Sequence, residues 1–266
     1  MCTTFFKHVM ISACDKSMLG WHGLQHGRGV VPGAAAGPQG RSGQVAKPHY
    51  LKKGLSKVPY RLDHLLYAGS DLDALTAHFE ALSGVKPGIG GVHPGMGSRN
   101  ALVSLGPDAY FELIAPDPAQ DIPGSFGDQF KAYASPRLFA YMVRASGLED
   151  ILEILKSEGI EADLVEASRA APDGGMLRWR LLMPRANPFG NLLPKFIDWT
   201  DTKHPGLTTV QGCSLVDYQI GHPDAVRLKH ILARLDVDLD VDIADRPCLR
   251  ARLLTPNGVV ILTSAD

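Results

Sequence analysis

Two stretches decide the fold: RLDHLLYAGSDLDALTAHFEALSG (residues 61–84) and RLFAYMVRASGLEDILEILKSEG (137–159). Each opens with a short apolar run typical of a buried strand, then repeats apolar residues at spacings of three and four, which predicts a helix. A serine, Ser70 or Ser146, stands at the expected N-cap of each helix, and a glycine follows its end. The same strand–helix unit is therefore expected at least twice.

Three strand candidates follow each predicted helix. They lie at 85–92, 99–105 and 109–114 in the first copy and at 160–167, 176–183 and 193–199 in the second. A third, looser copy starts near residue 213, with strand candidates at 237–242, 248–254 and 258–263. A sheet with a helix on one face needs another module over its other face. The sequence thus predicts an α+β (α/β) fold of repeated βαβββ modules, whose curved mixed sheet forms a cleft.

The predicted domain organisation has three parts. Residues 1–57 are expected to form a flexible N-terminal extension, because they are rich in glycine and poor in acids. Residues 58–206 hold the paired modules, at about 61–118 and 137–200, and residues 207–266 hold the third. We expect a cytoplasmic protein, with an organelle as the alternative if the extension acts as a transit peptide.

Composition and motifs limit the partners. Residues 61–266 carry 19 basic and 27 acidic side chains, and such an acidic body argues against binding nucleic acid. No stretch approaches the ~20 consecutive apolar residues of a membrane span. Glycine-rich nucleotide motifs such as GxGxxG are also absent, so no nucleotide cofactor is expected. The odd third module leaves sheet surface to cover, which allows a homodimer.

One histidine and one glutamate stand out inside apolar strands. Alternation along 61–69 puts Leu62, His64 and Leu66 on one face and Asp63 on the other. Glu112 lies within YFELI, where an unpaired carboxylate is costly. Imidazole and carboxylate are ligands that Zn, Ni, Mn or Fe accept. A hydrogen-bonded pair that only tightens the core is the alternative.

Four further residues extend this candidate site. His93 follows a glycine-rich loop and is a candidate general base, with a plain surface position as the alternative. Arg99 and Asn100 are candidates for contacting an anionic or carbonyl-bearing molecule. Trp179 alternates with the arginines in LRWRLL; if it faces the cleft it provides an aromatic floor, and otherwise the arginines face an acidic ligand.

The chain resembles the glyoxalase-like domain family of the vicinal-oxygen-chelate superfamily. The stretches that carry the resemblance are LDHLLYAGSDLDAL (62–75), HPGMGSRNALVSLG (93–106), AYFELIAPDP (109–118), PDGGMLRWRLLMP (172–184) and LLPKFIDWTDTKHPG (192–206). The resemblance implies a cleft with a divalent metal that His64 and Glu112 help to hold. It also implies ligands from the second module, where Ala140 stands opposite His64 and Asp198 is the candidate acid.

Two functions from different classes are compatible with this resemblance. The first is a metal-dependent lyase, isomerase or dioxygenase-type enzyme acting on a small oxygen-rich molecule, in which Glu112 or His93 moves a proton. The second is a metal-free protein that binds or sequesters a small molecule. Ala140 favours the second, because it removes an expected ligand.

Overall fold

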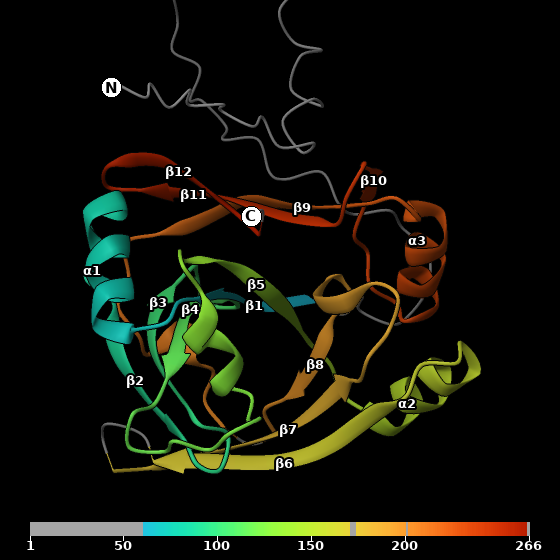
Figure 1. Cartoon of the computed structure of the whole chain (residues 1–266), viewed down its shortest axis with the longest axis horizontal. Coiled ribbons are helices and arrows are strands. Elements are labelled where there is room, and N and C mark those ends of the chain that lie inside the picture. The colour runs from blue at the N-terminus through green and yellow to red at the C-terminus, as the bar shows by residue number, and fades with distance from the viewer. Residues whose placement is uncertain (1–60, 171–173, 201, 265–266) are drawn as a thin grey trace, which may run out of the picture. The chain divides into compact units, whose positions relative to one another are not determined.

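The computed structural model describes residues 61–170, 174–200 and 202–264. Two strand–helix–three-strand modules come first along the chain (Figure 1). The first consists of β1 (Arg61–Ala68), α1 (Leu72–Ser83), β2 (Gly88–His93), β3 (Ser98–Ser104) and β4 (Tyr110–Pro116). The second consists of β5 (Arg137–Arg144), α2 (Leu148–Ser157), β6 (Ala162–Ala170), β7 (Met176–Pro184) and β8 (Lys195–Asp198). Short 3-10 turns lie at Asp128–Ala132, Gly190–Leu192 and Pro205–Leu207.

The two modules form one eight-stranded sheet in the order β2-β3-β4-β1-β5-β8-β7-β6. In each module the first strand pairs in parallel with the last, β1 with β4 and β5 with β8. The modules join through the antiparallel pair β1 and β5 at the centre. The first strands and the helices of the two modules match with a shift of 76 residues, from Arg61 to Arg137 and from Leu72 to Leu148. The sheet curls so far that its edge strands, β2 and β6, approach each other.

The central strand pair contains two β-bulges at matching places. The pairing skips Asp63 on β1 and Phe139 on β5, which are themselves 76 residues apart. A bulge breaks the simple alternation of side chains and re-aims the residues beside it. Phe139 therefore packs in the same apolar cluster as its neighbour Ala140. The expectation that Asp63 faces away from His64 fails for the same reason.

The helices occupy their predicted positions, with different caps. Asp71, rather than Ser70, accepts a hydrogen bond from the backbone of Ala74 and caps α1. Gly84 closes that helix in the left-handed conformation (φ 74°), as the sequence predicts. Gly147 is the first capping position of α2 and provides no side-chain acceptor.

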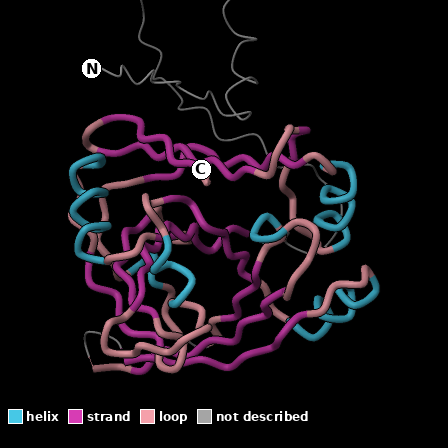
Figure 2. The backbone as a smooth tube through the Cα atoms, in the orientation of Figure 1, coloured by secondary structure: helices cyan, strands magenta, loops and turns pink. Residues whose placement is uncertain are grey.

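The last part of the chain forms a separate four-stranded sheet with the order β10-β9-β11-β12. Its elements are β9 (Ser214–His222), α3 (Ala225–Arg234), β10 (Val241–Ile243), β11 (Cys248–Thr255) and β12 (Gly258–Thr263). The element order is the predicted one, but β9 pairs in parallel with β10 rather than with the last strand. Figure 2 shows this sheet along the top of the view, above the eight-stranded sheet. Side chains of both sheets share one buried cluster, in which Leu253 and Tyr141 are fully buried.

Residues 1–57, for which a flexible extension is predicted, lie outside the described part of the chain. No helix within the described part has the length and apolar character required to cross a bilayer.

Candidate functional site

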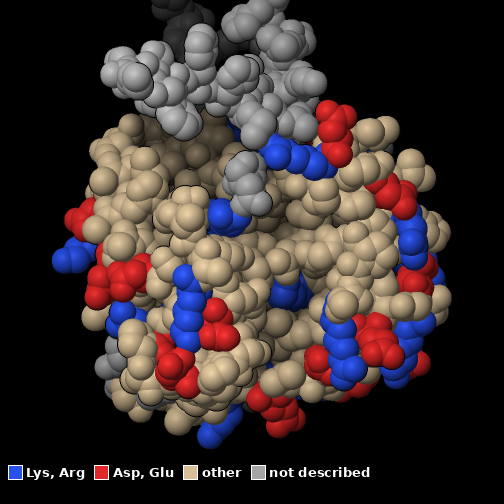
Figure 3. Space-filling view, viewed as in Figure 1, with Lys and Arg blue, Asp and Glu red and all other residues tan. Residues whose placement is uncertain are grey.

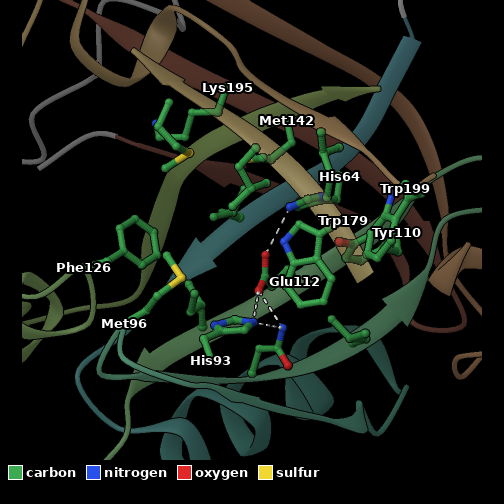
Figure 4. A pocket seen from close by; sticks show the side chains of 17 residues that line it. His64, His93, Met96, Tyr110, Glu112, Phe126, Met142, Trp179, Lys195 and Trp199 are labelled. Carbon is green, nitrogen blue, oxygen red and sulfur yellow. Dashed lines mark hydrogen bonds and ion pairs between the residues drawn. The ribbon is translucent and has the colours of Figure 1, made fainter. Parts of the chain in front are cut away.

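A pocket opens on the concave side of the eight-stranded sheet and takes side chains from both modules (Figure 4). It encloses about 610 Å³, counting the part open to solvent. Its polar members are His64, His93, Asn100, Tyr110, Glu112 and Lys195, and the rest are apolar or aromatic. A concave site with a few polar groups on a mainly apolar wall is typical of small-molecule binding.

His64 and Glu112 meet in this pocket. Their strands are neighbours, and Glu112 pairs with Leu66, two residues beyond His64 on the same face. The Nε2 atom of His64 lies 3.2 Å from Oε2 of Glu112. Both side chains are almost fully buried, at 4% and 5% exposure. The ring of Tyr110 stacks on the imidazole with centroids 4.4 Å apart and fixes its plane.

Asp63 holds the other side of the His64 ring. The Nδ1 atom of His64 donates to Oδ1 of Asp63 at 2.7 Å. The second carboxylate oxygen of Asp63 accepts three hydrogen bonds, from Arg144 Nε (2.9 Å), Trp199 Nε1 (3.0 Å) and His204 Nε2 (3.1 Å). The alternation in the sequence assigned Asp63 to the opposite face, whereas the structure buries it against His64 and His204. This network forms because the bulge at Asp63 turns its carboxylate toward His64. The sequence alone does not reveal the bulge.

The two carboxylates keep His64 charged. Burial alone would lower the pKa of His64, but the hydrogen bonds to Asp63 and Glu112 outweigh it and raise the pKa to about 9. Burial would raise the pKa of Glu112, yet His64 and Asn100 hold it well below its usual range. At neutral pH the site is therefore an imidazolium between two carboxylates. Its Nε2 proton points toward Glu112.

Asn100 orders the second half of the cluster. Its Oδ1 atom accepts from the backbone of Gly91 at 2.9 Å, which turns the amide nitrogen toward the pocket. That nitrogen donates to Oε1 of Glu112 at 2.6 Å and lies 3.2 Å from Nε2 of His93. The other ring nitrogen of His93 lies 2.9 Å from the hydroxyl of Ser98. His93 is thus brought to the site, 3.8 Å from Glu112, as part of an ordered network.

The structure does not bring Arg99 or Asp198 to the pocket. Strand alternation turns Arg99 away from Asn100 and toward Asp73 of α1, at 3.8 Å. Asp198 lies between the pocket residues Ile197 and Trp199 and faces the other side of β8. Its carboxylate accepts a hydrogen bond from the backbone of Thr200 instead.

Aromatic and apolar groups form the rest of the wall. Trp179 and Trp199 are both 8% exposed and line the pocket with ring centroids 5.5 Å apart. Trp179 therefore provides the aromatic floor, and Arg180 on the other face of β7 pairs with Glu149 of α2. Phe126 comes from the segment after β4.

Lys195 is the pocket residue that sequence reasoning missed. Leu66 pairs with Glu112 in the first module, and Met142, which is 76 residues further on, pairs with Lys195 in the second. Lys195 therefore occupies the position that corresponds to Glu112, where Asp198 was the predicted candidate. Its Nζ atom is buried and hydrogen-bonded to Asn191 at 2.9 Å. Burial lowers the pKa of Lys195 to about 8. Only the strand register reveals this correspondence.

The side chains in the pocket do not fit a resident metal ion. Sites built from protein ligands usually supply three or four donors. His64 and Glu112 provide two, but Nε2 of His93 faces the Asn100 amide. The second module contributes Ala140 and Lys195 at the corresponding positions. Within 61–170, 174–200 and 202–264, no group of three or more His, Cys, Asp or Glu side chains has a metal-binding arrangement.

Comparison with known proteins agrees with the architecture. The model of the glyoxalase-like domain family matches residues 62–235. A hypothetical protein from Staphylococcus aureus is similar at 18% identity and a TM-score of 0.53, covering 77% of this chain and 85% of that one. No curated protein matches.

Two epimerase structures match more weakly. A methylmalonyl-CoA epimerase in complex with methylmalonyl-CoA and NH4+ has 18% identity and a TM-score of 0.42, covering 56% of this chain and 100% of that one. The methylmalonyl-CoA epimerase from Mycobacterium tuberculosis has 22% identity and a TM-score of 0.40, covering 57% and 94%. The family match spans well over half of the sequence, and the paired modules agree with it. The chain belongs to the glyoxalase-like domain family of the vicinal-oxygen-chelate superfamily.

Proposed function

We propose that this protein is an isomerase- or lyase-type enzyme that moves a proton beside a carbonyl group of a small, oxygen-bearing molecule. The observation that carries the proposal is the buried His64–Glu112 pair, 3.2 Å apart, on the wall of a pocket lined mainly by apolar groups. An ionised carboxylate beside a charged imidazole supplies a proton acceptor and a hydrogen-bond donor at one point.

The proposed chemistry divides the work between these two side chains. A substrate carbonyl oxygen that accepts the Nε2 proton of His64 is polarised by the imidazolium. The same contact removes a hydrogen bond from Glu112, whose carboxylate becomes more basic and takes the proton from the neighbouring carbon. Asp63 keeps the imidazolium charged and oriented, through the 2.7 Å hydrogen bond to Nδ1. Asn100 holds the second oxygen of Glu112 in place.

The metal-dependent and dioxygenase-type forms of this function have less support from the donor set. His64 and Glu112 provide two metal ligands. At the position of the second module that corresponds to Glu112, Lys195 places a cation instead of a third ligand. We therefore derive no step through a metal.

A metal-free binding or sequestering protein is the second candidate. Ala140 and Lys195 favour it, because the second module carries neither of the ionisable groups found in the first. On this hypothesis the His64–Glu112 pair only shapes the wall of the pocket. The two candidates differ in one measurable property, which is proton exchange at a bound carbon.

Deuterium incorporation from heavy water decides between them. A panel of small ketones, 2-oxo acids and 2-hydroxy ketones is incubated with the protein, and the exchange is followed by NMR. The enzyme hypothesis expects exchange beside the carbonyl that Glu112→Gln abolishes. Asp198→Asn serves as the matched control, because it makes the same change from acid to amide on the last strand of the second module, outside the pocket.

The contrary outcome is equally clear. If panel members raise the melting temperature while none exchanges above the rate in buffer, the protein is a binder. Exchange that persists in Glu112→Gln at the wild-type rate would remove this residue from the proposed mechanism.

A further inference from the structure

Lys195 is a buried cation with a neutral partner. It is 7% exposed, and its ammonium donates a hydrogen bond to the amide oxygen of Asn191. Its ammonium also lies 5.5 Å from the centre of the Phe139 ring. Among the described residues, no Asp or Glu lies within ion-pair distance of Nζ. A buried charge without a counter-ion is costly, so this position is adapted to something other than stability.

The lysine shares the pocket with the acidic pair but takes a separate side of it. Glu112 and Lys195 occupy corresponding positions in the two modules, and both line the cavity. Figure 4 shows Lys195 toward the opposite side of the pocket from Glu112 and His93. A ligand with a negative charge is repelled by Glu112 and attracted by Lys195. The pocket therefore discriminates between the two ends of a ligand.

The wall between the two ends of the pocket carries no charge. On the face drawn in Figure 3, basic and acidic side chains are interspersed around a hollow near the centre. Between the two ends the wall is apolar, with Met142, Phe126 and Trp179 among its members. Such a wall accepts an aromatic or branched aliphatic body.

We propose that Lys195 anchors the carboxylate of a small ligand whose body is apolar, and thereby presents the other end of that ligand to His64 and Glu112. This inference rests on the proposed function only in requiring that a small molecule occupies the pocket. It names the substrate class as monocarboxylic acids with an aromatic or branched body. The ion pair supplies the counter-charge that the described protein residues do not provide.

Binding of matched acids and amides tests the anchor. Benzoate, phenylacetate and 3-phenylpropionate are compared with their primary amides by calorimetry at neutral pH, where Lys195 is mostly protonated. We expect at least one acid to bind about tenfold or more tightly than its amide, which is the size of a charge-assisted hydrogen bond. Lys195→Met removes this preference and Lys195→Arg retains part of it. Lys195→Met should fold, because it replaces a buried charge by an apolar side chain of similar length.

Two further variants keep the interpretation specific. Arg178→Met removes a positive charge from an exposed position on the adjacent strand β7, and the preference for acids should persist. Glu112→Gln removes the charge at the other end and should strengthen, or leave unchanged, the binding of acids. If only the net positive charge of the protein matters, Lys195→Met and Arg178→Met should weaken the binding of acids equally. That result contradicts the proposal.

Proton uptake provides a second measurement. A bound carboxylate stabilises the ammonium and raises the pKa of Lys195 from about 8. Near pH 8, binding of an acid should therefore take up protons, seen as a dependence of the binding enthalpy on the buffer, and Lys195→Met should lose this uptake. The other titratable groups that line the pocket, His64, His93, Tyr110 and Glu112, remain in that variant.

The outcomes separate the anchor from the proposed enzyme. Amides that bind as tightly as acids, a preference that survives Lys195→Met, or no binding by any probe overturns the anchor. Lys195-dependent binding without deuterium exchange supports the anchor and overturns the enzyme. If neutral ketones exchange deuterium in a Glu112-dependent way and acids bind no more tightly than amides, the enzyme is supported and the anchor is overturned.

Discussion

At the scale of single residues, His64 is the buried side chain that lies between two carboxylates, those of Asp63 and Glu112. It is stacked on Tyr110, held by Asp63 and paired with Glu112. Sequence reasoning selected His64 and Glu112 because charged side chains inside apolar strands require partners. It did not find Asp63, His204 or Lys195, whose roles depend on a bulge, a distant loop and a strand register. Those features are properties of the pairing between segments and are not visible along one segment.

The pKa of His64 makes stability depend on pH. The folded pKa of about 9 lies above the ordinary histidine pKa of 6.5, so the unfolded chain loses this proton first as the pH rises. The free energy of unfolding should therefore fall between pH 6.5 and 8, by about 2 kcal/mol. Urea unfolding at several pH values measures this slope.

The contribution of His64 to the pH dependence of stability can be separated with one variant and by staying below pH 8. His64→Gln should lose the slope, although it is less stable at neutral pH because Glu112 then lacks its cation. Above pH 8 the lowered pKa of Lys195 acts in the opposite direction, since the folded state there loses a proton that the unfolded chain keeps. A wild-type slope that is flat or rising from pH 6.5 to 8 contradicts the ion-pair description.

At the scale of elements, the repeat explains both what could be predicted and what could not. Hydrophobic spacing predicted the strands and helices of both modules because each is periodic within itself. The sequence named Asp198 as the second-module acid, but the register between β5 and β8 makes Lys195 the residue that corresponds to Glu112. A slip of one residue along a strand moves a side chain to the other face.

The correspondence between modules can be tested by completing the missing half-site. The double variant Ala140→His/Lys195→Glu places in the second module the two side chains that the first already carries at His64 and Glu112. We expect it to bind about one divalent ion, such as Zn²⁺, per chain, because four donors then surround one cavity. Elemental analysis of untagged protein after dialysis measures the content.

The wild-type protein and the single variants provide the controls for this design. With two donors, the wild type should retain little metal, and its melting temperature should not change with EDTA. If the wild type holds a stoichiometric ion that His64→Ala and Glu112→Ala lose, the site is a metal centre and the donor argument is wrong. A metal-free double variant that folds would instead show that the two positions do not correspond.

At the scale of the whole molecule, the four-stranded sheet completes the core of the paired modules. The rings of Tyr141 of β5 and Tyr218 of β9 lie 5.7 Å apart at a tilt of 52°, and Leu253 of β11 is fully buried in the shared cluster. The sequence predicted the element order of this segment but not its separate sheet, since several partners are compatible with the same strand pattern. The outer face of β1 and β5 is thus covered from within the chain.

This shared core should make the described part unfold as one unit. Leu253→Ala should cost about 2–5 kcal/mol, because it leaves a cavity in the common cluster. The loss should appear equally in far-UV circular dichroism and in the fluorescence of Trp179 and Trp199, which lie in the pocket. Val259→Ala on β12 is the control, since Val259 is 60% exposed and should change stability little. Separate transitions would mean that the two sheets fold independently.

The opposite charges at the two matched positions, Glu112 and Lys195, have a stereochemical consequence. A cavity whose halves were identical would accept a molecule in either of two orientations and treat both of its termini alike. Here a bound molecule with two chemically equivalent ends has one end beside the cation of Lys195 and the other beside the anion of Glu112. Its two ends thereby become distinguishable, and any reaction in this cavity is expected to be prochirally selective even on a symmetric compound.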